Sequence, residues 1–120
     1  MNLGPIVFYE HLYYFKEVMP DQPVYISVEL NGLSEKGTFF SFKQNMYDAT
    51  GQNVATYEMM GAWIDMNQRK LRELPQEFLQ HFKAFQPTDD FKVLTKEDTR
   101  KYHKIPKHIN PEVLKNTVNQ

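Results

Sequence analysis

The stretch "YDATGQNVATYEMMGAWID", residues 47–65, decides the fold of this chain. It opens with a turn signal in which Gly51 can supply the positive φ angle that a tight hairpin requires. Residues 54–65 then read as a strand that is apolar on both faces. One face carries Val54, Met60, Ala62 and Ile64, and the other carries Ala55, Tyr57, Met59 and Trp63.

Three more strand-like segments precede this one and have no internal repeat. Residues 5–17 are apolar on both faces and end before a polar loop bracketed by Pro20 and Pro23, which cannot continue a ladder. Residues 24–30, "VYISVEL", and residues 38–48, "TFFSFKQNMYD", follow. In the first of these, the expected inward residues are Val24, Ile26, Val28 and Leu30. Short links between successive strands favour an antiparallel sheet.

The second half of the chain has a different pattern. Residues 75–85 predict a short amphipathic helix, with Pro75 at its start and Phe or Leu at helical spacing. Thr95 with Asp98 resembles a capping box, and Asn110 before Pro111 can start a last short helix. From residue 92 to residue 115 there are seven Lys or Arg against three acidic residues. We expect a folded part over residues 1–87 and a loosely held basic tail over residues 88–120.

Composition excludes several classes of function. The chain has 120 residues, enough for one core, and its net charge of -1 gives no reason to expect nucleic acid or a membrane surface as a partner. It has no Cys, which excludes a disulfide framework and a thiol nucleophile. Without a leader or an apolar run of about 18 residues, a cytoplasmic location is the default expectation. No cofactor or metal is expected, since His103 and His108 with Glu97 and Asp98 match no ligand spacing and read as a solvated tail.

The order of four segments carries a family resemblance. Gly4-Pro5 opens a long aromatic strand, and "LNGLSEKG", "YDATGQNVA" and "GAWIDMNQRKLRELPQEF" follow in that order. Over residues 3–80 this resembles the acyl-CoA thioesterase-like hotdog proteins of the 4-hydroxybenzoyl-CoA thioesterase type. The resemblance implies an α+β fold, a hotdog-like curved antiparallel β-sheet with short C-terminal helices. It also implies a dimer in which edge strands or sheet faces meet, and hydrolysis of an acyl-CoA thioester. Because both sheet faces are apolar and the first strand should lie at an edge, we expect a homodimer or tetramer.

The chain departs from this family at its start. The family carries a first strand, a loop of the type "D..GH.NN" with the catalytic Asp, and a long helix ahead of the Gly-Pro strand. This sequence has no Gly-His pair and no Asn-Asn pair. Either the chain begins at an internal Met of a longer protein, or it is a shortened member whose missing layer is replaced. Hydrolysis then requires an acid supplied from elsewhere or replaced by Glu or His.

The candidate catalytic residues are His11 and Glu58, which with Glu10 are the ionisable residues most embedded in apolar sequence. Such surroundings perturb pKa values. The resemblance makes their two strands neighbours, but the alternation of side chains alone does not place His11 and Glu58 on one face. A His or Glu among strand aromatics is also typical of an interface residue with a hydrogen-bonded neighbour, and this alternative stays open.

The candidate substrate-binding residues are Tyr13, Met59 and Trp63, since apolar pockets suit acyl chains. The same Met and Trp are equally readable as plain core. The basic tail could contact the phosphates of coenzyme A or a nucleic acid, although a charge run is usually a solvated surface. Two functions therefore stay open. The chain is a thioesterase, or it is a non-catalytic hotdog module that binds an acyl thioester or assembles with itself.

Overall fold

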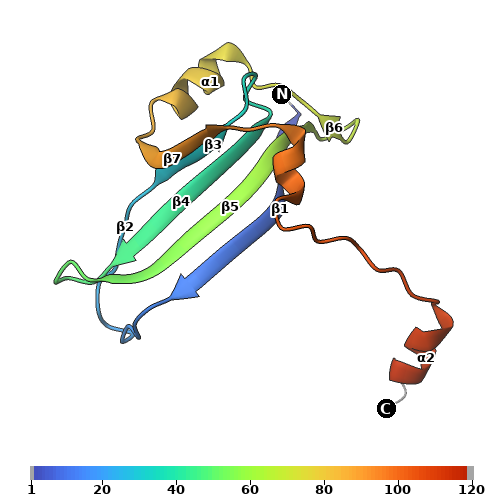
Figure 1. Ribbon diagram of the computed structural model, residues 1–120, viewed down its shortest axis with the longest axis horizontal. Coiled ribbons are helices and arrows are strands. Elements are labelled where there is room, and N and C mark those ends of the chain that lie inside the picture. Colours follow the sequence, from blue (N-terminus) through green and yellow to red (C-terminus); the bar gives the residue numbers. More distant parts are fainter. Residues whose placement is uncertain (1, 119–120) are drawn as a thin grey trace.

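The computed structural model of the protein describes residues 2–118, and its centre is a curved, seven-stranded sheet (Figure 1). The hairpin predicted around Gly51 is confirmed: β4 (Phe39–Tyr47) and β5 (Asn53–Asp65) pair antiparallel, and Gly51 has a φ angle of 85°. Asp48 stabilises the turn, because one of its carboxylate oxygens accepts the amide N–H groups of Thr50 and Gln52 at 2.9 and 3.0 Å.

The first strand, β1 (Leu3–Tyr14), pairs antiparallel with β5 and forms one edge of the sheet. It ends three residues earlier than predicted. The register of the pair shifts by one residue between Val7 and Tyr9, which is a β-bulge at Phe8. Gly61 lies opposite Val7 where the strands come close, since a Cβ on Gly61 would lie 2.4 Å from the carbonyl oxygen of Ile6.

The prediction of one strand over residues 24–30 is wrong in the length of the strand and in which of its residues are buried. The structure divides it into β2 (Tyr25–Ile26) and β3 (Glu29–Leu33), both of which pair with β4. Leu30 is buried as expected, but Val24, Ile26 and Val28 are exposed. The alternation of apolar residues predicted burial correctly only at Leu30, where the segment meets the core.

Two strands were not predicted. β6 (Lys70–Leu71) pairs with β5, and β7 (Pro87–Val93) pairs with the free edge of β3. Because β7 runs parallel to β3, the sheet is mixed and not wholly antiparallel as expected. The strand order is β1, β5, β4, β3, β7. The division of the chain into residues 1–87 and 88–120 stays a prediction. β7 begins at this boundary, at Pro87.

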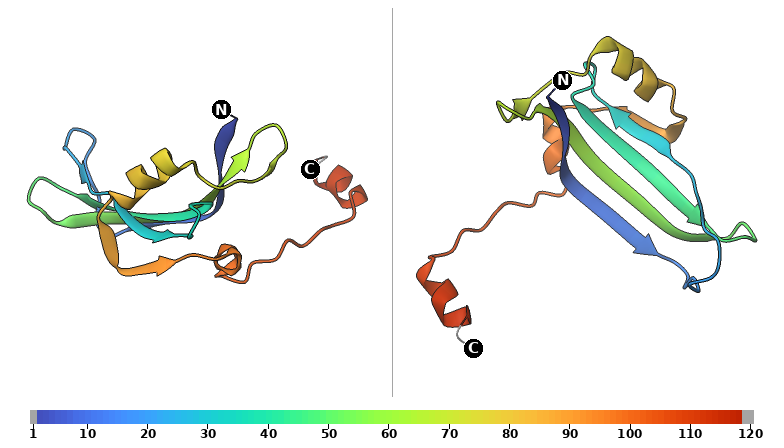
Figure 2. Two further views of the ribbon diagram at one scale, coloured as in Figure 1. Left: turned by 90° about the horizontal axis from the view of Figure 1, so that it is seen from above. Right: turned by 180° about the vertical axis from the view of Figure 1, so that it is seen from behind.

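The predicted helix is present as α1 (Gln76–Lys83), with Pro75 as its N-cap residue. It covers one face of the sheet, which we call the α1 face (Figure 2). Phe82 contacts the rings of Phe40, Phe42 and Trp63 there, with ring centres 5.6–5.9 Å apart. The buried members of this cluster are Leu30, Leu33, Phe40, Leu74 and Leu79.

The other face is covered by the segment that follows β7, the 3₁₀-helix η1 (Lys96–Arg100), and we call it the η1 face (Figure 2). The predicted capping box is confirmed, since Thr95 and Asp98 exchange both of its hydrogen bonds. Leu94 packs there in a second buried cluster with Phe39, Met60 and Ala62. The last helix, α2 (Glu112–Val118), lies away from the sheet (Figure 1).

Candidate functional site

His11 and Glu58 lie directly opposite each other in the register of β1 and β5. Paired positions of an antiparallel sheet point to the same face, with Cβ atoms about 4.5–5.5 Å apart. The bulge at Phe8 decides this face: without it, His11 would be paired with Tyr57 and would point to the α1 face. The structure thus brings together both candidate catalytic residues.

The pair belongs to a row of four ionisable residues that crosses the sheet. Glu58 is also opposite Lys43 of β4, and Lys43 is opposite Glu29 of β3. The row reads His, Glu, Lys, Glu from the β1 edge inward. Glu58 is therefore a carboxylate positioned between an imidazole and an ammonium group.

Aromatic rings surround His11 on the η1 face. Its ring centre lies 5.5 Å from that of Tyr9 on the same strand and 4.4 Å from that of Tyr102, which follows η1. Tyr9 and Tyr102 also contact each other at 5.0 Å in an edge-to-face arrangement. His11 Nδ1 is buried and has no hydrogen-bond partner within residues 2–118. An unpaired buried polar atom is costly, and it is a common mark of a functional position.

Tyr9 keeps its proton at neutral pH. Burial, followed by the nearby Tyr102, Glu58 and Asp98, raises the pKa of Tyr9 to about 12. A phenol that is neutral and partly buried is a hydrogen-bond donor that can stabilise negative charge developing on a neighbouring group. The η1 face thus combines a carboxylate, an imidazole and a neutral phenol.

The three candidate substrate-binding residues do not form one group. Tyr13 lies on the η1 face, 52% exposed, with its ring centre 6.2 Å from that of His11. Met59 and Trp63 lie on the α1 face, packed against the cluster under the helix. Because successive strand residues alternate between faces, Glu58 and Met59 point in opposite directions. Within one chain, Met59 and Trp63 are separated by the sheet from His11 and Glu58.

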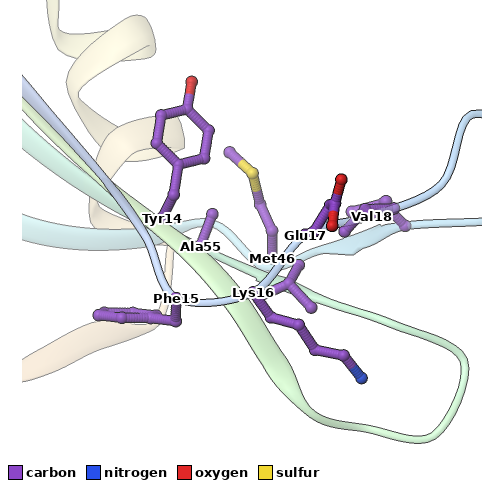
Figure 3. A pocket seen from close by; sticks show the side chains of 9 residues that line it. Tyr14, Phe15, Lys16, Glu17, Val18, Met46 and Ala55 are labelled. Carbon is purple, nitrogen blue, oxygen red and sulfur yellow. The ribbon is translucent and has the colours of Figure 1, made fainter.

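The α1 face has an open cavity of its own at the far end of the sheet, with a volume of about 640 Å³. Tyr14, Met46 and Ala55 point to the same side of the strands, whereas Phe15 points away from these three (Figure 3). Lys16 at its rim forms two hydrogen bonds within the chain, since its Nζ donates to Gln52 at 2.6 Å and to Asp48 at 3.3 Å. The lining of the cavity is mostly apolar, and Glu17 is its other charged residue.

Glu10 also lies on the α1 face, where the hydroxyl of Tyr57 donates a hydrogen bond to its carboxylate. This bond, and then burial, raises the pKa of Tyr57 to about 12. Glu10 therefore lies on the opposite face of the sheet from His11 and Glu58, and its carboxylate is hydrogen-bonded to Tyr57.

Sequence reasoning missed Tyr9 and Tyr102. The i, i+2 spacing of Tyr9, His11 and Tyr13 was a signal for the first of them, because strand residues two apart share a face. Tyr102 gave no such signal, since it belongs to the basic tail and comes near His11 only through the path of η1.

The structure also bears on metal binding and on membrane-spanning helices. Within residues 2–118, no group of three or more His, Asp or Glu is placed to hold a metal ion. None of the helices in the described part of the chain is long and apolar enough to span a bilayer.

Comparison with known proteins gives a family and a fold. The model of the thioesterase-like superfamily matches residues 2–82. No curated protein matches the chain.

Solved structures at low identity share the fold. A hypothetical protein from Staphylococcus aureus in complex with CoA is 18% identical, with a TM-score of 0.63, and the match covers 88% of this chain and 64% of that one. A DHNA-CoA thioesterase from Staphylococcus aureus is 16% identical, with a TM-score of 0.60 and coverages of 69% and 54%. A 1,4-dihydroxy-2-naphthoyl-CoA thioesterase from Synechocystis is 13% identical, with a TM-score of 0.61 and coverages of 69% and 60%. The chain spans less than two thirds of the length of each of these structures.

Proposed function

Because the chain belongs to the thioesterase-like superfamily, we propose that it binds an acyl thioester of coenzyme A on the η1 face and hydrolyses it there. The observation that carries this proposal is the opposition of His11 and Glu58 beside the neutral phenol of Tyr9. Family and fold supply the substrate class, and these residues supply a base and a donor. Glu58 then takes the part of the carboxylate whose usual motif this sequence does not contain.

The reaction uses these groups in a fixed order. The Glu58 carboxylate takes a proton from a water molecule, whose oxygen attacks the thioester carbonyl carbon. The Tyr9 hydroxyl donates a hydrogen bond to the oxyanion of the tetrahedral intermediate. The carbon–sulfur bond then breaks, and the departing thiolate recovers the proton from Glu58. The products are a carboxylic acid and a thiol, and His11 positions the Glu58 carboxylate from the opposite strand.

A second candidate function is binding without hydrolysis. The observation that favours it is the ring of Tyr102, whose centre lies 4.4 Å from that of His11. A ring so close to His11 leaves little room beside it for a water molecule placed to attack. If this ring stays in place, the η1 face holds a thioester without cleaving it.

Two measurements on the whole chain separate these functions. Release of free thiol from acyl-CoA, followed with a thiol reagent, reports hydrolysis. Calorimetry with a thioether analogue, which has no cleavable carbonyl–sulfur bond, reports binding. Thiol release well above the rate without protein supports the enzyme, and analogue binding without thiol release supports the binding module. If neither is observed with short-chain, medium-chain and aromatic acyl groups, the proposed function is wrong.

A further inference from the structure

A basic groove runs along β1 on the η1 face, next to the candidate site. It consists of two adjoining cavities of about 250 and 280 Å³, which share Phe8, Thr99 and Arg100. One continues to Tyr9 and Tyr102, and the other to Ile6 and the β5–β6 turn. Its walls carry four cationic side chains, Arg69, Lys96, Arg100 and Lys104.

These four cations are available for a ligand. None of them forms an ion pair with any residue from 2 to 118, in contrast to Lys16, Lys92 and Lys115. They come from two distant segments, the β5–β6 turn and the region of η1. Four unpaired positive charges on the walls of one groove attract an anion with several charges, such as a group of phosphates.

The backbone at Arg69 gives a second indication. Arg69 has a φ angle of 57°, in the left-handed region that a residue with a side chain rarely occupies. Its amide N–H donates to the carbonyl oxygen of Asp65 at 2.7 Å, which holds the turn in this conformation. Residues kept in such conformations cluster at ligand-binding positions.

The groove also has aromatic walls. The ring of Phe8 lies 6.3 Å from that of Phe39, and the ring of Tyr9 lies 5.0 Å from that of Tyr102. Phe8 alternates with Val7 along β1, so its ring lies on the η1 face and lines both cavities of the groove. Aromatic faces stack on planar bases, and cationic side chains beside them bind phosphates. Together the two features match a nucleotide.

We propose that this groove binds the adenosine-phosphate end of the coenzyme A thioester, an inference that rests on the proposed function. The order of residues along β1 supports it. Ile6 lies in the groove, and His11 follows five residues later, about 15 Å along a strand. Phosphates bound at the Ile6 end of the groove, beside Arg69 and Lys96, leave this length for the extended arm that joins them to the thioester. The acyl group then lies beyond His11, next to the exposed ring of Tyr13.

The test uses adenosine 3′,5′-bisphosphate, which has the phosphates and the base but no thioester. Calorimetry on the whole chain should show binding that weakens as salt is added, because the contacts are ionic. The double variant Lys96→Ala, Arg100→Ala should weaken binding at least tenfold. The matched control is Lys36→Ala, Lys107→Ala, which removes the same charge from exposed positions outside the groove and should leave the affinity unchanged.

The outcomes distinguish this inference from the proposed function. An acyl thioester of N-acetylcysteamine carries no nucleotide, so its cleavage by the unmodified chain reports the proposed function alone. Bisphosphate binding that only the groove variant weakens supports the inference, even if no thioester is cleaved. An absence of bisphosphate binding, or an equal loss in both double variants, overturns the inference, even if the short thioester is cleaved.

Discussion

His11 on β1 lies directly opposite Glu58 on β5, and one bulged residue between Val7 and Tyr9 puts it there. Before the bulge the strands pair with Val7 opposite Gly61, and after it they pair with Tyr9 opposite Met60. A shift of one residue turns every later side chain of β1 to the other face. The arrangement of the candidate site is therefore a consequence of register.

The close approach of the strands at Gly61 gives a first prediction. Gly61→Ala places a methyl group against the carbonyl oxygen of Ile6 and the ring of Phe40, so β1 must move away from β5. We expect a loss of about 1–3 kcal/mol in the free energy of unfolding, measured by urea denaturation. A methyl group at Gly4 would instead meet the flexible side chain of Met66. A Gly61→Ala variant with an unchanged midpoint would contradict this close approach.

Packing of α1 on the sheet gives a second prediction. Phe82 contacts three rings of the α1 face, so Phe82→Ala should lower the free energy of unfolding by about 3 kcal/mol. Ending the chain after His108 is the control. It should change the urea midpoint little, because Ile109, Val113 and Leu114 are exposed. Equal effects of the two changes would show that α1 is not specifically packed.

The hairpin turn gives a pH-dependent prediction. Hydrogen bonds from Thr50, Gln52 and Lys16 lower the pKa of Asp48 from 3.8 to about 2. A lowered folded-state pKa contributes stability above pH 3.8, and this contribution is lost as the pH falls toward 2. Asp48→Asn should therefore lower stability at pH 7 and narrow its gap to the unmodified chain between pH 4 and pH 2. Urea unfolding over this range measures the gap.

The control for this prediction is Asp21→Asn, because the Asp21 side chain forms no hydrogen bond with a residue that the structure describes. It should leave the pH dependence unchanged. A constant gap between Asp48→Asn and the unmodified chain from pH 7 to pH 2 would show that the turn does not depend on the charged carboxylate.

Exposure of the β1 edge gives a prediction about assembly. β1 is an edge strand of the sheet, and its residues Val7, Leu12 and Tyr14 are 53%, 43% and 77% exposed. Apolar edge strands promote pairing with another chain. We therefore predict a homodimer or tetramer in sedimentation at micromolar concentration, shifted toward monomer by Val7→Asp with Leu12→Asp. A stable monomer of the unmodified chain would refute this prediction.

Much of the sheet could be predicted because its signals are local. Gly51 marks a hairpin wherever it lies between two strand patterns, and Phe78, Leu79 and Phe82 repeat at helical spacing regardless of context. The capping box of Thr95 and Asp98 is also a signal over four residues. These features need only their own sequence neighbours.

The remaining features depend on contacts between distant residues. β7 is polar in "PTDDFKV" and becomes a strand because the edge of β3 offers it hydrogen-bond partners. Alternation of apolar residues could not reveal the bulge at Phe8, so it could not show that His11 and Glu58 share a face while Met59 and Trp63 lie on the other. Tyr102 meets His11 only after the chain has passed through β7 and η1.

The assignment of the η1 face as the reactive one is tested most directly by a matched pair of variants, Glu58→Gln and Glu10→Gln. Both remove one carboxylate and keep its shape, but Glu58 lies on the η1 face and Glu10 is bound by Tyr57 on the α1 face. The measurement is thiol release from acyl-CoA at pH 7. We expect Glu58→Gln to lower the rate by a factor of about a hundred or more, and Glu10→Gln to leave it within about twofold. The opposite result, with Glu10 required and Glu58 dispensable, would move the reaction to the α1 face and contradict the account.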